Sequence, residues 1–186
     1  MTFRRRWPLT LTLALLASAV MMPSPQARGE MVRFQEVESG KIYRGGQPES
    51  LADYALLQRL GIHTIINLKT TRQEIEQEAA LAKSFGMTMI SRPTGTFFGA
   101  TDEEVDEIQS LLQDPKLQPL LIHCRHGKDR TGLMIGIYRV ETQGWGPQEA
   151  YSEMLSLGFN PLLLGLRHRF WERMEHKPPL LNPAFY

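Results

Sequence analysis

The residues best suited to chemistry lie in one ten-residue segment, 123–132, with the sequence HCRHGKDRTG. This segment contains Cys124, the only cysteine of the 186-residue chain. Free cysteine titrates near pH 8.5, but at a helix N-terminus or beside basic side chains its pKa falls to about 3.5–7.5. Arg125, Lys128 and Arg130 all follow within six positions. We therefore expect Cys124 to be a thiolate at neutral pH and able to act as a nucleophile.

The same segment is suited to binding an anion of the size of phosphate. It follows an apolar strand expected at 119–123 and comes before a helix expected at 133–140. In an open α/β sheet this junction lies at the carboxyl end of a strand, where ligands bind, and the N–H groups at the start of a helix converge on an anion. Arg130 can hold two oxygens of the anion with its planar fork, and Thr131 can donate its hydroxyl to the sulfur. The other predicted binding residues of this loop are Arg125, His126, Gly127 and Lys128.

Other roles for this segment have less support. A zinc ion takes about four ligands, but the chain has no second cysteine and its three histidines outside the segment lie far away in sequence. Cys124 and His126 are therefore not expected to bind a metal, and we expect no cofactor. His123 is expected to orient the loop through a hydrogen bond rather than to act as a base.

The spacing from Cys124 to Arg130 is the Cys-X5-Arg signature of the protein tyrosine phosphatase superfamily, which the segment also resembles in its preceding His, its Gly and its final Thr-Gly. The similarity extends over about residues 38 to 160, to small bacterial exported dual-specificity phosphatases and to atypical ones of plants and fungi. The resemblance implies a central sheet with flanking helices and phosphomonoester hydrolysis through a cysteinyl-phosphate intermediate, without a metal. The further stretches that carry it are IYR and QP within 42–48, LLQRLGIHTIINL ending at Leu68, and LLIHCRHGKDRTGLMIGIYRVETQGW.

The resemblance leaves the substrate open. The first hypothesis is a phosphotyrosine or dual-specificity phosphatase acting on phosphoproteins. The second is an inositol polyphosphate phosphatase, because Arg125, His126 and Lys128 concentrate positive charge inside the loop. A non-catalytic phosphate-binding module is the alternative from another class, although a binder would need only the backbone cradle.

The general acid is open as well. Relatives with a separate acid loop carry an Asp after the strand near residue 90, but the loop 91–100 contains none, and Asp102 comes only at the start of the next helix. Asp129 resembles the loop Asp proposed as the acid in a subgroup of bacterial phosphatases. Asp129 is thus either the acid or a tether for Arg130 or Lys128. Asp102 is either the acid or a first-turn residue favoured by the helix dipole.

Composition and patterning predict one α/β domain. The chain is 42% hydrophobic and 22% charged, and 21 basic against 20 acidic residues leave no basic footprint for nucleic acid. Strand and helix patterns alternate, which predicts a central, mostly parallel sheet of four to five strands flanked by helices. One face of the last helix is expected in the core; it carries Leu162, Leu163, Leu166, Phe170 and Trp171. The expected strands are 41–43, 62–68, 87–90 and 119–123, after a polar lead-in, and the expected helices are 51–60, 72–85, 101–113, 133–140, 147–157 and 162–174.

The first 27 residues resemble a secretory signal peptide with a short polar lead. Three arginines at 4–6 come before an apolar stretch at 7–22, and cleavage is expected after Ala19 or Ala27. We expect a periplasmic or secreted single phosphatase domain at 28–186, a monomer without membrane insertion once the signal is removed. An uncleaved N-terminal helix that anchors the domain to a membrane is the alternative.

Overall fold

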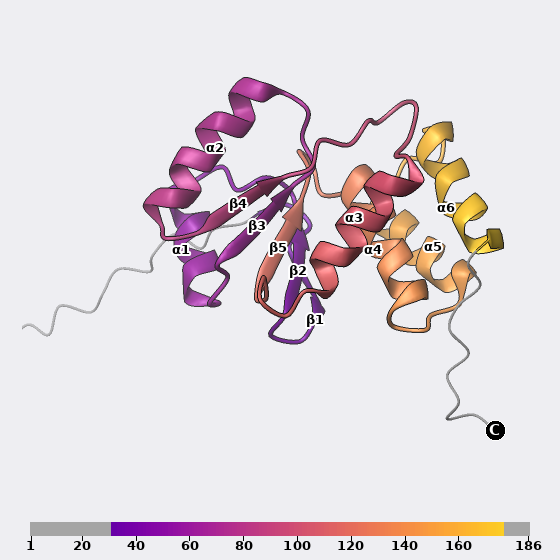
Figure 1. Cartoon of the computed structure of the whole chain (residues 1–186), viewed down its shortest axis with the longest axis horizontal. Helices are drawn as coiled ribbons and strands as arrows, with labels where there is room; N and C mark the ends of the chain where they lie inside the picture. Colours follow the sequence, from indigo (N-terminus) through magenta and orange to yellow (C-terminus); the bar gives the residue numbers. More distant parts are fainter. Residues whose placement is uncertain (1–30, 177–186) are drawn as a thin grey trace, which may run out of the picture.

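A five-stranded sheet carries the chain's predicted loop at its centre (Figure 1). The computed structural model describes residues 31–176, so the predicted signal peptide lies outside the described residues. The strand order is β1-β2-β5-β3-β4, and every pairing is parallel except that of β1 with β2. This confirms the predicted sheet. The strands are β1 (Gln35–Glu38), β2 (Ile42–Gly45), β3 (Thr64–Asn67), β4 (Thr88–Ser91) and β5 (Leu120–His123).

The edge strand β1 was not expected from the sequence. Its four residues, QEVE, include only one apolar side chain, Val37, which is the one that is buried. Such a short polar stretch lacks the alternation that predicts a half-buried strand. The strand forms because the neighbouring β2 offers an open edge for pairing.

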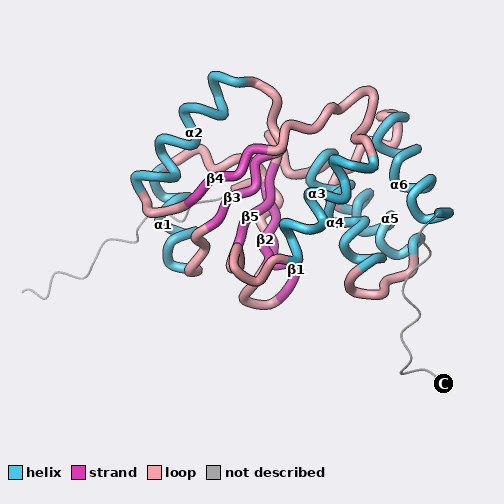
Figure 2. Tube along the Cα trace, viewed as in Figure 1, coloured by secondary structure: helices cyan, strands magenta, loops and turns pink. Residues whose placement is uncertain are grey.

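Helices cover both faces of the sheet (Figures 1 and 2). In one core cluster, Leu121 of β5 packs with α1 and α2; in the other, Leu120 and Ile122 pack with α3 to α6. Adjacent residues of a strand face opposite sides, so one apolar strand supplies both cores. The helices are α1 (Leu51–Arg59), α2 (Arg72–Ser84), α3 (Asp102–Gln113), α4 (Asp129–Glu141), α5 (Pro147–Ser156) and α6 (Leu164–His176).

Two helix boundaries correct the sequence prediction. The helix expected from residue 133 begins four residues earlier, at Asp129, because the end of the predicted binding loop forms its first turn. Every residue from 131 to 140 is buried, so α4 lies between the sheet and the other helices. The helix expected from Leu162 begins at Leu164, and Leu162 is 79% exposed rather than part of the core, whereas Leu166 and Phe170 are fully buried as expected.

The start of α3 is fixed by the predicted capping box. Thr101 Oγ1 accepts a hydrogen bond from Glu104 N at 3.2 Å, and Glu104 Oε2 accepts one from Thr101 N at 2.9 Å. This pairing satisfies N–H groups that a helix start leaves open.

Within residues 31–176, no helix has both the length and the apolar character that crossing a bilayer requires.

Candidate active site

The segment 123–132 forms the connection from the end of β5 to the first turn of α4, as the sequence predicts. Its tightest point is Gly127, which has a positive φ of 69°. A Cβ atom there would lie 2.4 Å from the carbonyl carbon of Gly45 and 2.5 Å from the nitrogen of Gly46. Only glycine therefore allows the loop to rest on the end of β2.

Four successive carbonyl groups of the loop are held by groups outside it or at its edge. In a planar trans peptide, the N–H points away from the carbonyl of the same unit. Holding the carbonyls on one side therefore turns the following N–H groups to the other side, and the Gly127 N–H interacts with the sulfur of Cys124 there. The contacts are Cys124 O with His123 Nδ1 (3.1 Å), Arg125 O with Gln47 N (3.1 Å), His126 O with Arg33 Nη1 (3.1 Å) and Gly127 O with Arg44 Nη2 (2.7 Å).

The surroundings of Cys124 favour its thiolate. Burial alone raises the pKa of the thiol, but the hydroxyl and N–H of Thr131, the charge of Arg130 and the N–H of Gly127 lower it by more, so the pKa lies below its ordinary value. The Thr131 hydroxyl is buried and has no oxygen or nitrogen partner among the described residues, so it is available to donate to the sulfur of Cys124. The expectation of a thiolate therefore has a structural basis.

Arg130 lies across the loop from Cys124, beside the end of β3. Its Nη1 donates a hydrogen bond to the carbonyl of Leu68 at 3.0 Å. This contact fixes the guanidinium near enough to the sulfur to lower its pKa. The role of Arg130 in holding anion oxygens stays a prediction.

A buried polar cluster supports the loop from behind. His123 Nε2 lies 2.6 Å from Glu78 Oε1, while its Nδ1 contacts the Cys124 carbonyl, which agrees with the predicted orienting role. Glu78 also pairs with Lys69 at 2.9 Å and accepts a hydrogen bond from Asn67. Burial raises the pKa of Glu78, but His123 and Lys69 lower it by more, so this carboxylate is ionised at neutral pH.

Sequence reasoning missed this cluster. The helix at 72–85 has the composition of a surface helix, and nothing in its Glu and Gln spacing distinguishes Glu78 from its exposed neighbours. Lys69 directly follows the apolar stretch that ends at Leu68, which was the only available hint of a functional position.

The predicted binding side chains lie at the rim of the loop. Arg125 is 58% exposed and points to α2, where its Nη2 lies 3.1 Å from Glu74 Oε1. Lys128 Nζ lies 3.8 Å from Asp129 Oδ2, and His126 is exposed. The structure therefore brings Gly127 and the backbone to the sulfur, and turns the Arg125 side chain toward α2.

The two candidate acids have different surroundings. Asp129 is mostly buried and accepts a hydrogen bond from Asn160 N at 2.8 Å, so it contacts Lys128 and Asn160 while Arg130 is held elsewhere. Asp102 is 59% exposed and lies 3.0 Å from Arg169, on α6. Asp102 is thus tied to α6, while Asp129 remains part of the loop.

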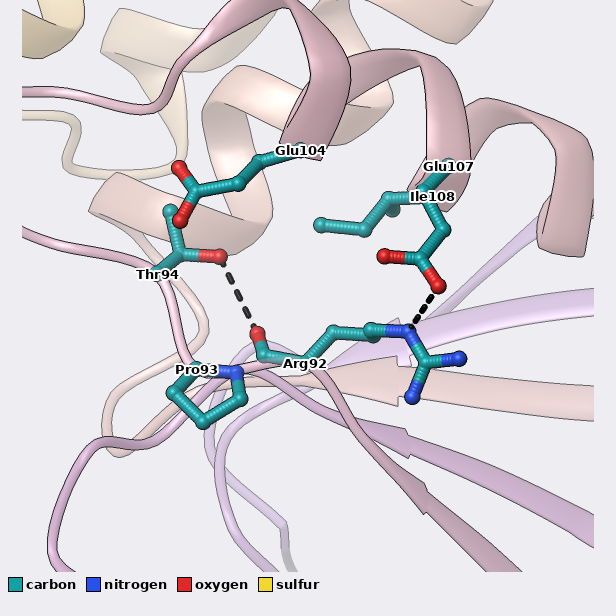
Figure 3. A pocket seen from close by; sticks show the side chains of 6 residues that line it. All are labelled: Arg92, Pro93, Thr94, Glu104, Glu107 and Ile108. Atoms are coloured by element: carbon teal, nitrogen blue, oxygen red, sulfur yellow. Dashed lines mark hydrogen bonds and ion pairs between the residues drawn. The ribbon is translucent and has the colours of Figure 1, made fainter.

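The segment 92–94, which precedes Asp102, is held against α3 by an ion pair (Figure 3). Arg92 Nε lies 2.7 Å from Glu107 Oε1, and the Thr94 hydroxyl donates to the Arg92 carbonyl at 3.1 Å. These residues line a cavity of about 180 Å³ between the chain after β4 and α3. Cys124 is not part of its lining.

Within residues 31–176, no group of three or more His, Cys, Asp or Glu side chains is placed to hold a metal ion.

Known proteins are similar to this chain in sequence and in fold. The family model described as the tyrosine phosphatase family matches residues 30–160. The dual specificity protein phosphatase TpbA of Pseudomonas aeruginosa is 31% identical over 121 residues, which are 65% of this chain and 53% of that protein. The inositol diphosphatase DSP4 of Arabidopsis thaliana is 34% identical over 127 residues, 66% of this chain and 62% of that protein.

The fold of this chain is similar to that in a crystal structure of a P. aeruginosa TpbA variant in complex with phosphotyrosine. Its TM-score is 0.60 at 28% identity, covering 73% of this chain and 86% of that one. Among the curated relatives, the match to TpbA spans about half of that protein's length.

Proposed function

Because the chain belongs to the tyrosine phosphatase family, we propose that it hydrolyses phosphomonoesters through a cysteinyl-phosphate intermediate on Cys124. The observation that carries this proposal is the combination of a thiol of lowered pKa with a backbone cradle whose N–H groups face the sulfur. A non-catalytic phosphate-binding module would need the cradle but not Cys124, Arg130 and Thr131 around one point.

The chemistry has two steps. The Cys124 thiolate attacks phosphorus, forming an S–P bond as the P–O bond to the leaving group breaks, and Asp129 supplies the proton that the leaving oxygen takes up. Water then attacks phosphorus and gives a proton to the Asp129 carboxylate, which restores the acid. The S–P bond breaks in the same step, so inorganic phosphate is released and the thiolate, to which Thr131 donates, is restored. Arg130 holds two phosphoryl oxygens throughout, where a planar fork stabilises the charge of the transferring group.

The charges around the loop favour a phosphotyrosine or dual-specificity protein substrate over an inositol polyphosphate. The positive charge of Arg125 is paired with Glu74, and that of Lys69 with Glu78. A hollow of about 210 Å³ beside them is lined by three carboxylates, those of Glu49, Glu74 and Glu78. Carboxylates repel the additional phosphates of a polyphosphate. Of the three side chains that motivated the inositol hypothesis, Arg125 is paired with Glu74, and Lys128 lies 3.8 Å from Asp129.

Exposed apolar side chains lie on the segments around residues 97 and 162, the second of which contacts the end of the loop through Asn160. The N–H of Asn160 bonds to the carboxylate at the end of the loop, and Leu162 lies exposed two residues later. A Cβ atom on Gly165 would lie 2.4 Å from the carbonyl oxygen of Phe97, so the backbones of these two segments are in direct contact. The side chains of Phe97 and Phe98 are 78% and 101% exposed. Apolar side chains of this kind suit a tyrosine ring or a peptide.

The direct test compares phosphate release from a phosphotyrosine peptide and from phytate at equal concentrations. The proposal expects faster release from the peptide, and a reversed preference would select the inositol polyphosphate alternative. Cys124→Ser should abolish turnover but keep phosphate binding, because the alcohol is a poor nucleophile while the N–H cradle is unchanged. Turnover retained in this variant would overturn the covalent mechanism.

The acid is tested by its dependence on the leaving group. Asp129→Asn should lower kcat by about 10²–10⁴ on alkyl phosphates, the range of general acid catalysis, and far less on p-nitrophenyl phosphate, whose leaving group needs no proton. Asp102→Asn is the matched control and should behave like the wild type, since Asp102 is paired with Arg169. A loss that follows Asp102 would reassign the acid.

We also propose export through residues 1–27. The support is the sequence pattern alone. Fractionation of cells expressing the full chain should find the protein outside the cytoplasm, and a variant lacking residues 1–27 should stay inside. Equal distribution of the two proteins would contradict export.

A further inference from the structure

Arg44 is buried in a way that packing alone does not explain. It lies on β2, has no exposed surface, and is among the largest fully buried side chains of the described residues. Its Nη2 donates to the carbonyl of Gly127 at 2.7 Å, while Nε and Nη1 are buried without a hydrogen-bond partner. None of the ion pairs among residues 31–176 includes Arg44. Breaking or omitting the partner of a buried charge destabilises a fold, so this arginine calls for a local reason.

The surroundings place Arg44 beneath the predicted phosphate-binding loop. A Cβ atom on Gly132, in the first turn of α4, would lie 4.0 Å from Arg44 Nη2. The guanidinium therefore lies between the tight point of the loop at Gly127 and the start of the helix that follows. It holds the middle of the segment 123–132 through Gly127 and lies close to the end of that segment at Gly132.

The charge of Arg44 and that of Cys124 stabilise each other. The pKa of Arg44 is lowered to about 10, mainly by burial; the carboxylate of Glu153 and the thiolate of Cys124 partly oppose this lowering, and Arg139 and Arg33 add to it. Arg44 thus remains charged at neutral pH. Because Coulomb attraction is mutual, a charged Arg44 favours the thiolate form of Cys124.

Arg33 repeats the same contact from a different segment. Its Nη1 donates to the carbonyl of His126 at 3.1 Å, and its Nε donates to the carbonyl of Leu157 at 2.9 Å. Its backbone has a positive φ of 55°, which is uncommon for a residue other than glycine. Two adjacent carbonyls of the loop, those of His126 and Gly127, are therefore held by two arginines from separate parts of the chain.

We infer that Arg44 and Arg33 are positioning residues for the site: they hold the carbonyls of Gly127 and His126 away from the bound phosphate and so direct the following N–H groups at it. Arg44 also adds a fixed positive charge beneath the thiolate. The inference rests on the proposed function only for its kinetic consequence. The orientation of the loop and the reactivity of Cys124 are measurable without turnover.

The decisive variant is Arg44→Met, with Arg173→Met as the matched control. Arg173 is another buried arginine, but it is paired with Glu141, the last residue of α4, and with Asp106 and Asp102 of α3. The rate of Cys124 alkylation by iodoacetamide is measured against pH, together with the protection that inorganic phosphate gives. Arg44→Met should move the pH midpoint upward and weaken phosphate protection by about 10- to 100-fold, the effect of a lost hydrogen bond to a charged group. Arg173→Met should lower the thermal midpoint and leave both readouts at the wild-type level.

Two further variants keep the test open if Arg44→Met does not fold. Arg44→Lys retains the charge and should keep the pH midpoint near that of the wild type while phosphate protection falls. Arg33→Met removes an exposed side chain and should weaken phosphate protection with little change in thermal stability. Wild-type protection in Arg33→Met together with a wild-type profile in the Arg44 variants that fold would overturn the inference.

A failure of the proposed function would look different. If the wild type releases no phosphate from any monoester, but phosphate still protects Cys124 and the Arg44 variants weaken that protection, then the positioning role stands and the catalytic proposal falls.

Discussion

Replacing Gly127 with alanine would add one carbon atom where the structure has no room for it. The Cβ atom would lie 2.4 Å from the carbonyl carbon of Gly45 and 2.5 Å from both the oxygen of Gly45 and the nitrogen of Gly46. All three are backbone atoms at the end of β2, so no side chain can turn away. The loop itself must rise from the strand.

The size of that movement follows from the distances. Ordinary contact with a Cβ begins at 3.4 Å, so a contact of 2.4 Å requires a separation of about 1 Å between the loop and β2. Misplacing catalytic groups by about 1 Å costs about 10²-fold in rate. The left-handed backbone at φ 69° adds strain of about 1–2 kcal/mol for any residue with a Cβ.

Gly40→Ala separates the two effects. Gly40 has a φ of 66°, and a Cβ there would meet nothing within 4 Å. Both variants carry the same kind of backbone strain, and Gly127→Ala should lose more stability in thermal unfolding because of its additional clash with β2. With p-nitrophenyl phosphate as substrate, kcat/KM should fall about 10²-fold in Gly127→Ala and stay near the wild-type value in Gly40→Ala. Equal activity of the two variants would refute the argument that the loop is set by its contact with β2.

Three further outcomes are expected. The pKa of Glu78 is lowered in the folded protein, so ionised Glu78 stabilises the fold above its ordinary pKa of 4.5, and this stabilisation should be lost as pH falls through its pKa in the folded protein. The thermal midpoint of Glu78→Gln should therefore lie below that of the wild type at pH 7 and approach it in acid. A difference that does not change with pH would contradict the lowered pKa. Thr131→Val removes a hydroxyl that lowers the pKa of Cys124, so the pH midpoint of iodoacetamide alkylation should rise, and an unchanged midpoint would show that the hydroxyl does not reach the sulfur. Gly165→Ala would place a Cβ 2.4 Å from the carbonyl of Phe97, and denaturant unfolding should show a loss of about 1–3 kcal/mol from overpacking; a loss below about 0.5 kcal/mol would mean that the contact yields without cost.

Features that depend on neighbours along the chain can be predicted from the amino-acid sequence. The capping box joins Thr101 to Glu104, three positions apart, and the central strand is apolar at every residue from Leu120 to Ile122. The spacing from Cys124 to Arg130 likewise identifies the loop, because both residues belong to one strand-to-helix connection. Local interactions of this kind act over a few residues, so their pattern is visible in the sequence.

The contacts that hold the loop in place join residues far apart in sequence and form only in the folded chain. The contact of Arg44 with Gly127 spans 83 positions, and that of Arg33 with His126 spans 93. The buried position of Glu78 also follows from the packing of α2 on the sheet, since its helix has the composition of a surface helix. Such contacts depend on which elements become neighbours in space, and no periodicity in one segment records the partner that another segment will bring.

The two carboxylates that the sequence left open show the same division. Asp129 and Asp102 each stand at the first position of a helix, where an acid is favoured by the dipole. Their difference lies in what packs beside them: Asn160 holds the first within the loop, and Arg169 of α6 holds the second at 3.0 Å. A helix start predicts an acid at that position, but its chemistry is set by the distant segment that folding brings against it.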